Sequence, residues 1–354
     1  MGRNKHSNIA IFIPHNGCPH RCAFCNQRTI SGAVTQPTAK DVRKAVNTAL
    51  SSPHFDGENA EIAFFGGSFT AIDPDYMVEL LEAAHEFVAE GKVSGIRIST
   101  RPDAIDDEVL KTLKKYGVTS IELGAQSMRD EVLAMNRRGH TALDVINASA
   151  LIRQYGFSLG LQMMTGLYGD DNVGARYTAR QLAALRPDTV RIYPTVVLKG
   201  TELAEKMRTR EYIPQGYEAA AELCAQLLRF FEQKRINVIK LGLHASDGVE
   251  GNMVGGAYHP AFRELCEGIL YYRLIRGTLS EQYPEGGDYI VYVPKADISK
   301  AAGQKKANIS RLALDGWHVI IKGDDSIDGK ERRKCKIEPV HQPDSETQAG
   351  SNRH

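Results

Sequence analysis

The sequence has little from which to build a membrane span or a disulfide scaffold. Its 354 residues include only six cysteines and one tryptophan. The longest apolar runs, such as residues 9–14 and 62–65, fall far below the roughly 18 residues that a transmembrane helix needs. The first residues, MGRNKHSN, lack the apolar segment of a signal peptide. We therefore expect a cytoplasmic protein that makes no membrane contact.

Neither sign of charge is in excess. Lys and Arg number 44 against 43 Asp and Glu, a formal net charge of +1. This balance excludes a chain that is basic throughout, although a local basic patch remains compatible with it. The hydrophobic fraction of 42% and charged fraction of 25% are typical of a globular chain and exclude disorder throughout. The length allows two domains, or one large domain with a small appendage.

Between residues 8 and about 245, short apolar segments alternate with longer amphipathic ones. Expected strands are residues 9–13, 61–65, 95–99, 120–123, 158–163, 189–193 and 236–241. Expected helices are residues 39–50, 74–89, 106–116, 142–155, 172–185 and 217–234. Strands and helices in strict alternation indicate a parallel sheet. Because no glycine-rich phosphate loop follows the first strand, we expect an α/β fold of the partial (βα)6 TIM-like barrel type, with ligands at the carboxyl ends of the strands.

After residue 245 the pattern changes, which predicts four parts for the chain. The partial barrel spans residues 8–245, and a helical extension and linker spans 246–286. A small α+β module follows over 287–323. Residues 324–354 are charged and polar, and we expect a flexible tail there.

Three of the six cysteines stand close together. Cys18, Cys22 and Cys25 follow the first expected strand with the spacing CX3CX2C, whereas Cys224 and Cys266 lie in apolar helical contexts that predict buried structural thiols. Three thiolates on one loop can hold three corners of an iron–sulfur cube and leave one iron open. A zinc site that recruits His15 or His20 is an alternative. Cys335 is expected to be an exposed cysteine of the tail.

This cysteine spacing, with the aromatic Phe24 before the last cysteine and a βα series after it, resembles the radical S-adenosylmethionine (SAM) superfamily. The resemblance implies a [4Fe–4S] cluster held by Cys18, Cys22 and Cys25, whose open iron binds SAM. It further implies reductive cleavage of SAM to a 5′-deoxyadenosyl radical and a reductant such as flavodoxin or ferredoxin.

Further segments at strand ends strengthen the resemblance. Gly66, Gly67 and Ser68 are similar to the glycine motif of the family, where the backbone approaches SAM closely. The family lines the SAM pocket from the ends of the next strands. By this resemblance the other residues that contact SAM are Phe24, Ser99, Arg101, Gln126, Gln162 and Met163.

Residues 121–141 most resemble the radical SAM half of the Elongator catalytic subunit and, more distantly, oxygen-independent coproporphyrinogen oxidases. By that resemblance Arg137 pairs with the SAM carboxylate and Gln126 bonds the ribose. The cysteine spacing is more compact than in the Elongator enzyme, and we expect a branch without the acetyltransferase domain. Arg191 and Tyr193, at the end of the sixth expected strand, are the expected catalytic residues on the substrate side.

The C-terminal module carries a degenerate K-homology (KH) motif. The run AGQKKANISRL, residues 302–312, is similar to the KH core, except that Lys306 stands where the second glycine is expected. Such a loop clamps a nucleic-acid backbone, and lysines surround it. We therefore expect RNA, and tRNA in particular, as a partner.

Three functions remain open from the sequence. The first is a radical SAM enzyme that modifies RNA, most plausibly tRNA. The second keeps the radical chemistry but acts on a small molecule such as a tetrapyrrole. The third is an RNA-binding protein whose cluster is structural or redox-sensing.

Overall fold

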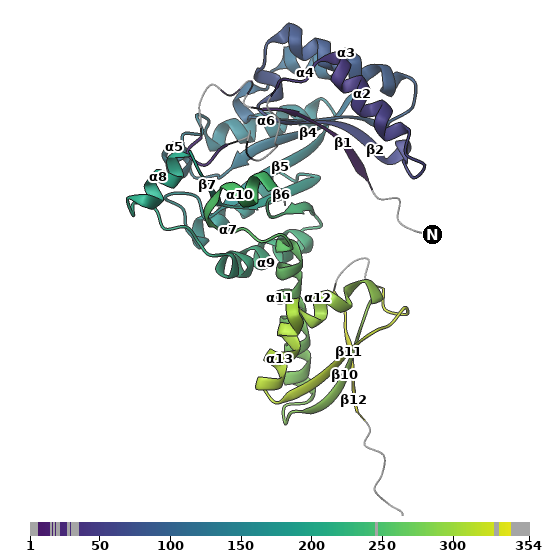
Figure 1. The fold of residues 1–354 in the computed structure, drawn as a ribbon, viewed down its shortest axis with the longest axis vertical. Coiled ribbons are helices and arrows are strands. Elements are labelled where there is room, and N and C mark those ends of the chain that lie inside the picture. The colour runs from purple at the N-terminus through teal and green to yellow at the C-terminus, as the bar shows by residue number, and fades with distance from the viewer. Residues whose placement is uncertain are drawn as a thin grey trace, which may run out of the picture. The chain divides into compact units, whose positions relative to one another are not determined.

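The computed structural model describes residues 6–14, 16, 18, 22–26, 29, 35–244, 247–328 and 333–340. The chain divides into two compact units, Met1–Arg263 and Glu264–His354 (Figure 1). No helix within the described ranges is both long and apolar enough to cross a membrane.

A parallel sheet of seven strands forms the first unit, in the order β1-β2-β3-β4-β5-β6-β8. The strands are β1 (Ser7–Ile13), β2 (Ala60–Gly66), β3 (Gly95–Thr100), β4 (Val118–Gln126), β5 (Ser158–Thr165), β6 (Thr189–Pro194) and β8 (Asn237–Leu241). A shorter antiparallel pair joins β7 (Val196–Leu198) to β9 (Met253–Gly256). The expected partial barrel is confirmed, and all seven expected strands are present.

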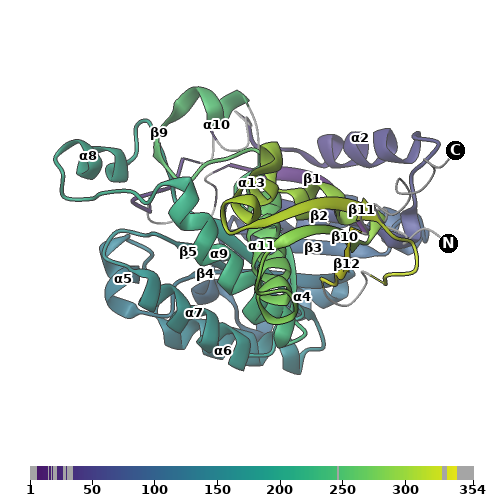
Figure 2. The ribbon, with the colours of Figure 1, turned by 90° about the horizontal axis from the view of Figure 1, so that it is seen from below.

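Helices cover one face of this sheet, as Figure 2 shows for α6 and α7 beside β4 and β5. The longer helices are α2 (Ala39–Leu50), α3 (Pro74–Ala89), α4 (Asp107–Lys115), α6 (Ala142–Gln154), α7 (Asn172–Ala184) and α9 (Tyr217–Gln233). Thr38 and Thr141 form capping boxes that start α2 and α6. Shorter helices are α5 (Asp130–Met135), α8 (Glu202–Arg208) and α10 (Asp247–Asn252).

The two faces of the sheet differ in chemistry. Under the helices, alternate residues such as Ile9, Ile62, Ile98 and Leu161 are buried and apolar. Residues of the opposite, inner face alternate with them and include charged side chains in the middle of strands. Arg191 on β6 lies 5.2 Å from the ring centre of Phe65 on β2, so the sheet curls until these separated strands touch. The strand ends of this curled sheet therefore surround one shared space.

The second unit has its own core. It comprises most of α11 (Phe262–Gln282), then β10 (Gly287–Val293), α12 (Ile298–Ala302), α13 (Ala307–Leu314), β11 (Trp317–Gly323) and β12 (Lys336–Pro339). β10 lies between parallel β11 and antiparallel β12. Side chains from α11, the sheet and both short helices form this core, among them Tyr271, Ile275, Val291, Leu312 and Trp317.

The boundaries differ from those expected at several places. The division between units falls after Arg263, and within the expected helical extension and linker one helix, α11, continues to Gln282. Within the expected tail, Lys336–Pro339 pairs with β10, and Ile337 is buried in the core. Cys335 packs beside that core, where burial raises the pKa of its thiol. Short, charged segments carry too weak a periodicity to reveal an edge strand, because their stability comes from the neighbouring strand.

Candidate active site

The loop after β1 carries the three clustered cysteines. Cys22 is buried, and Cys18 and Cys25 are half-buried. Backbone hydrogen bonds hold the loop at Ala23, which donates to the carbonyl of Asn136 at 3.1 Å and accepts from the amide of Leu203 at 2.8 Å. The loop is thus attached to segments far along the chain. His15 and His20, the ligands of the zinc alternative, lie outside the described residues.

Two arginines stand beside these thiols. Arg138 Nη1 donates to Cys22 Sγ at 3.1 Å, and Nη2 donates to the carbonyl of Gly124 at 2.7 Å. Arg101 donates to the carbonyl of Arg138 at 3.0 Å and binds Asp103 through two nitrogens. Burial and the neighbouring Cys22 raise the pKa of the Cys18 thiol above its ordinary value, although Arg138 and Arg101 act in the opposite direction. These guanidinium groups favour negative charge at the cysteine loop.

A turn at the end of β2 brings backbone close to the same loop. Gly66 has a φ of 109°, and a Cβ on Gly67 would lie 2.0 Å from the carbonyl oxygen of Asn16. The Gly67 amide donates to the carbonyl of Ile13 at 2.6 Å. Neither position accepts a side chain without moving the backbone. The two glycines expected from the sequence are therefore required by this turn.

Ser68 joins the turn to the end of β3. Its hydroxyl lies 2.9 Å from that of Thr100 and accepts from the amide of Arg101 at 3.1 Å. Thr70 also bonds the hydroxyl of Thr100, at 2.7 Å. The buried Ser68 side chain thus fixes the position of Arg101.

Of the two adjacent arginines, the structure brings Arg138 to the cysteines and not Arg137. The side chain of Arg137 is 65% exposed and pairs with Glu202 at 2.9 Å. Its backbone has a φ of 52°, so the chain turns sharply at this residue. The side chains of Arg137 and Arg138 therefore reach different partners, Glu202 and Cys22. The family resemblance assigned Arg137 to the SAM carboxylate, and that assignment stays a prediction.

Gln126 ends β4 with a φ of 64°, and its buried Oε1 atom has no hydrogen-bond partner among the described residues. Phe24 packs beside Val197, Leu203 and Tyr212. Met163 is fully buried on the helix-covered face. The residues expected to line the SAM pocket therefore do not all lie together: Gln126 lies at the end of a strand, and Met163 lies in the core.

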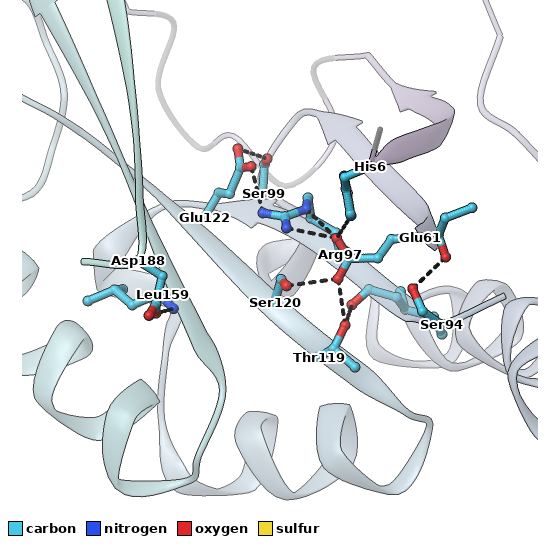
Figure 3. A network of polar contacts seen from close by, with 12 residues as sticks. His6, Glu61, Ser94, Arg97, Ser99, Thr119, Ser120, Glu122, Leu159 and Asp188 are labelled. Carbon is cyan, nitrogen blue, oxygen red and sulfur yellow. Dashed lines mark hydrogen bonds and ion pairs between the residues drawn. The ribbon is translucent and has the colours of Figure 1, made fainter. Parts of the chain in front are cut away.

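A network of buried charges lies on the inner face of the sheet (Figure 3). Glu61 accepts from Arg97, Thr119 and Ser120, and His6 lies 2.9 Å from it. Burial raises the pKa of Glu61, but Arg97 and the two hydroxyls outweigh burial, and the pKa ends below its ordinary value. Arg97 also donates to Glu122 at 3.0 Å.

Glu122 connects this network to the residues expected to be catalytic. Arg191 binds both carboxylate oxygens, at 2.7 and 2.8 Å, and Gln162 donates at 3.0 Å. Ser99 lies at 3.5 Å. Burial acts to lower the pKa of Arg191. The Glu122 charge and Tyr193 outweigh burial, and the pKa of Arg191 ends above its ordinary value. Arg191, Gln162 and Ser99 thus share one buried acceptor, which orients them.

Sequence reasoning missed Arg138, Glu122, Arg97 and Glu61. A signal existed for the last three, because ionised residues alternate with Ile and Leu in mid-strand, as in IRIS and IEL. An ionised residue in such a position must be paired or must face a polar space.

The site residues fit the expected cofactors in part. Within the described ranges, no three His, Cys, Asp or Glu side chains form a preformed metal site, so the three thiols are not brought together as a finished ligand set. The chemistry of the donors fits, since thiolates are the usual ligands of iron–sulfur clusters and two arginines border them. The tight glycine turn and the unpartnered Gln126 oxygen fit a polar ligand beside the loop.

Comparison with known proteins extends this picture along the chain. Residues 12–181 match the family model of the radical SAM superfamily, and residues 187–271 match that of the radical SAM C-terminal domain. An archaeal Elp3 from Methanocaldococcus infernus has the same fold, with a TM-score of 0.60 and 21% identity over 77% of this chain and 63% of that one.

Curated relatives are similar over the same region. A tRNA uridine(34) acetyltransferase from Methanocaldococcus jannaschii is 28% identical, covering 61% of this chain and 47% of the relative. Elongator complex protein 3 from Homo sapiens is 29% identical, covering 62% and 48%. The chain thus spans about half the length of these relatives. Radical SAM enzymes use a [4Fe–4S] cluster and SAM, and the cysteine loop, the glycine turn and both family matches agree: the chain belongs to the radical SAM superfamily.

Proposed function

We propose that this chain is a radical SAM enzyme that modifies RNA, with tRNA as the substrate class. The observation that carries the radical chemistry is the CX3CX2C loop, with Cys22 bonded to Arg138 beside the Gly66–Gly67 turn. Cys18, Cys22 and Cys25 would hold the cluster. When bound, the cluster and SAM supply a 5′-deoxyadenosyl radical.

The chain's own residues would prepare the pocket for that chemistry. Arg138 and Arg101 place positive charge beside the thiols, and Ser68 fixes the backbone of Arg101. Glu122 orients Arg191 and Gln162 on the inner face, where a substrate group would enter. We propose that Arg191 and Tyr193 act there as oriented binding groups, because the bidentate pair with Glu122 fixes the direction of the Arg191 guanidinium.

The loop between α12 and α13 supports RNA as the substrate. Gly303 has a φ of 75°, and a Cβ there would lie 2.8 Å from the Asn308 side chain. Lys305 and Lys306 both adopt left-handed backbone conformations, with φ values of 51° and 62°. Each such residue costs about 1–2 kcal/mol relative to glycine. Lysine at these positions is therefore expensive for folding, which suggests that the two charges are used.

The adjacent start of α13 suits a phosphate. No side chain caps this helix end, where Lys306 is the capping residue. The first-turn amides of a helix and its dipole attract anions, and two lysines reinforce that attraction. The order β10-α12-loop-α13-β11 also has the strand and helix sequence of the KH core expected from the motif. We propose that this loop binds the backbone of the RNA substrate.

The test compares Lys305→Glu/Lys306→Glu with the intact chain in a filter-retention assay of tRNA. We expect retention to weaken at least about tenfold near 0.1 M salt, and the salt slope to fall by about two, because each lysine neutralises about one phosphate. Lys40→Glu/Lys44→Glu on exposed α2 is the matched control and should retain tRNA normally.

If both double variants lost tRNA retention equally, the loss would be explained by the change in net charge. The loop of residues 303–306 would then not be the RNA-binding site. Retention of tRNA by neither variant nor the intact chain would favour a small-molecule substrate instead. Transfer of an acetyl group, named for some relatives, is not carried over to this chain, since it covers about half of each. A cytoplasmic location and a flavodoxin- or ferredoxin-type reductant remain predictions.

A further inference from the structure

Among the described residues, most charged side chains on the inner face of the sheet are paired with an opposite charge, but the one on β8 is not. Across β2, β3 and β4, Arg97 lies between the carboxylates of Glu61 and Glu122, as Figure 3 shows. Arg191 on β6 then completes the pairing of Glu122. The two carboxylates and two guanidinium groups neutralise one another. The next charged residue on this face is Lys240 on β8.

Lys240 has no such compensation. It is paired in register with Arg191 across β6 and β8, which places both side chains on the same face. Within the part of the chain that the structure describes, no hydrogen bond or ion pair is formed by its ammonium group. Burial, and then the charges of Arg191 and Arg263, lower the pKa of Lys240. A half-buried cation without a counter-ion is costly, so an anion brought to this place gains binding energy.

Arg263 adds a third cation from a different element. It lies at the start of α11, and Nη1 donates to the carbonyl of Val238 on β8 at 2.7 Å. This bond fixes Arg263 beside the strand that carries Lys240. Arg263 and Lys240 therefore lie close to each other at the β8 side of the sheet.

Aromatic side chains share the inner face with these cations. Phe12 on β1 and Phe65 on β2 are paired in register, with ring centres 6.2 Å apart. Phe12 is 38% exposed, unusual for a large apolar side chain within a strand. Arg191 lies over Phe65, so the aromatic pair and the cations belong to one surface. A ligand with both a planar ring and an anionic group matches this combination.

We propose that Lys240 is a binding residue for a phosphate group of the nucleotide substrate. This inference rests on the proposed function, since it assigns the phosphate to the nucleotide that the radical chemistry modifies. It places a phosphate contact inside the barrel, separate from the loop of residues 303–306 in the second unit.

The test measures equilibrium binding of uridine 5′-monophosphate and of uridine to the reconstituted full-length protein by ligand-observed NMR titration. We expect the monophosphate to bind about tenfold more tightly, since a charged hydrogen bond contributes on that order. Lys240→Gln should abolish this preference, and Lys240→Arg should keep most of it. Lys234→Gln, an exposed neighbour at the end of α9, is the matched control and should bind like the intact protein.

Equal binding of the two ligands to the intact protein would overturn the inference, as would a phosphate preference that survives Lys240→Gln. Thermal unfolding of each variant shows whether it is folded, and Lys240→Arg keeps the test valid if Lys240→Gln is not. The outcome is independent of tRNA retention. If the protein preferred the monophosphate through Lys240 but did not modify tRNA, only the proposed function would be contradicted. If it modified tRNA but showed no preference for the monophosphate, only this inference would be contradicted.

Discussion

Among single residues, Arg138 and not Arg137 borders the cysteine loop. Arg138 bonds both Cys22 and the Gly124 carbonyl, whereas the exposed Arg137 pairs with Glu202. Exposed ion pairs contribute about 0–1 kcal/mol, while a hydrogen bond that involves a charged group contributes about 1.5–3 kcal/mol. The two neighbours should therefore respond very differently to substitution.

We predict that Arg138→Gln lowers iron content after reconstitution and raises the KM for SAM by about tenfold or more, because the loop loses the half-buried cation that donates to Cys22. Arg137→Gln should change neither by more than about threefold. Iron analysis and 5′-deoxyadenosine formation at varied SAM concentrations provide the measurements. A larger loss in Arg137→Gln than in Arg138→Gln would support the sequence assignment and refute the placement seen in the structure.

The residue scale also shows where sequence reasoning stopped. Cys224 and Cys266 were expected to be buried thiols, and both are buried; burial raises the pKa of Cys224 to about 12. The pairing of Arg191 with Glu122 joins positions 69 residues apart and could not be derived from spacing. Which partner neutralises a buried charge depends on the curvature of the sheet, and local patterns carry no information on curvature.

At the scale of elements, the turn after β2 holds the site together. It places Gly67 against the carbonyls of Asn16 and Ile13, and it begins the Ser68–Thr100 contact to β3. The element therefore joins the cysteine loop to two strand ends. Because the backbone at Gly67 lies against the carbonyl oxygen of Asn16, even a methyl group at Gly67 would overlap the loop.

We predict that Gly67→Ala destabilises the fold by about 1–3 kcal/mol and lowers iron incorporation, because the new Cβ overlaps the backbone of the cysteine loop. Gly251→Ala is the matched control, since a Cβ there meets nothing within 4 Å. Thermal unfolding and iron analysis of both variants test this. If Gly67→Ala unfolded and bound iron like Gly251→Ala, the turn would not hold the loop as described.

The sequence patterns predicted the strands and helices better than any other feature of the structure. The strands of the sheet and the start of α2 and α6 follow the predicted ranges closely, because apolar periodicity and threonine caps are local signals. β12 was not anticipated, since Lys336–Pro339 is short and charged, and β10 supplies the hydrogen bonds that stabilise it. The same holds for the left-handed Lys305 and Lys306, whose backbone conformation is unusual for lysine.

At the scale of the whole molecule, the chain combines a curled seven-stranded sheet with a separate three-stranded unit. The first unit carries the cysteine loop, the glycine turn and the charged inner face. The second carries the lysine loop that we propose for RNA. In our proposals the first unit carries the radical chemistry and the phosphate contact of Lys240, and the second unit binds RNA.

The most direct test of the central claim is anaerobic reconstitution with iron and sulfide, reduction by dithionite, and measurement of 5′-deoxyadenosine formed from SAM. We predict product from the intact chain and none above background from Cys22→Ala, because Cys22 accepts a hydrogen bond from Arg138 and is one of the three proposed cluster ligands. If the reconstituted chain held its cluster yet left SAM intact, with and without tRNA, the account of this protein as a radical SAM enzyme would be contradicted.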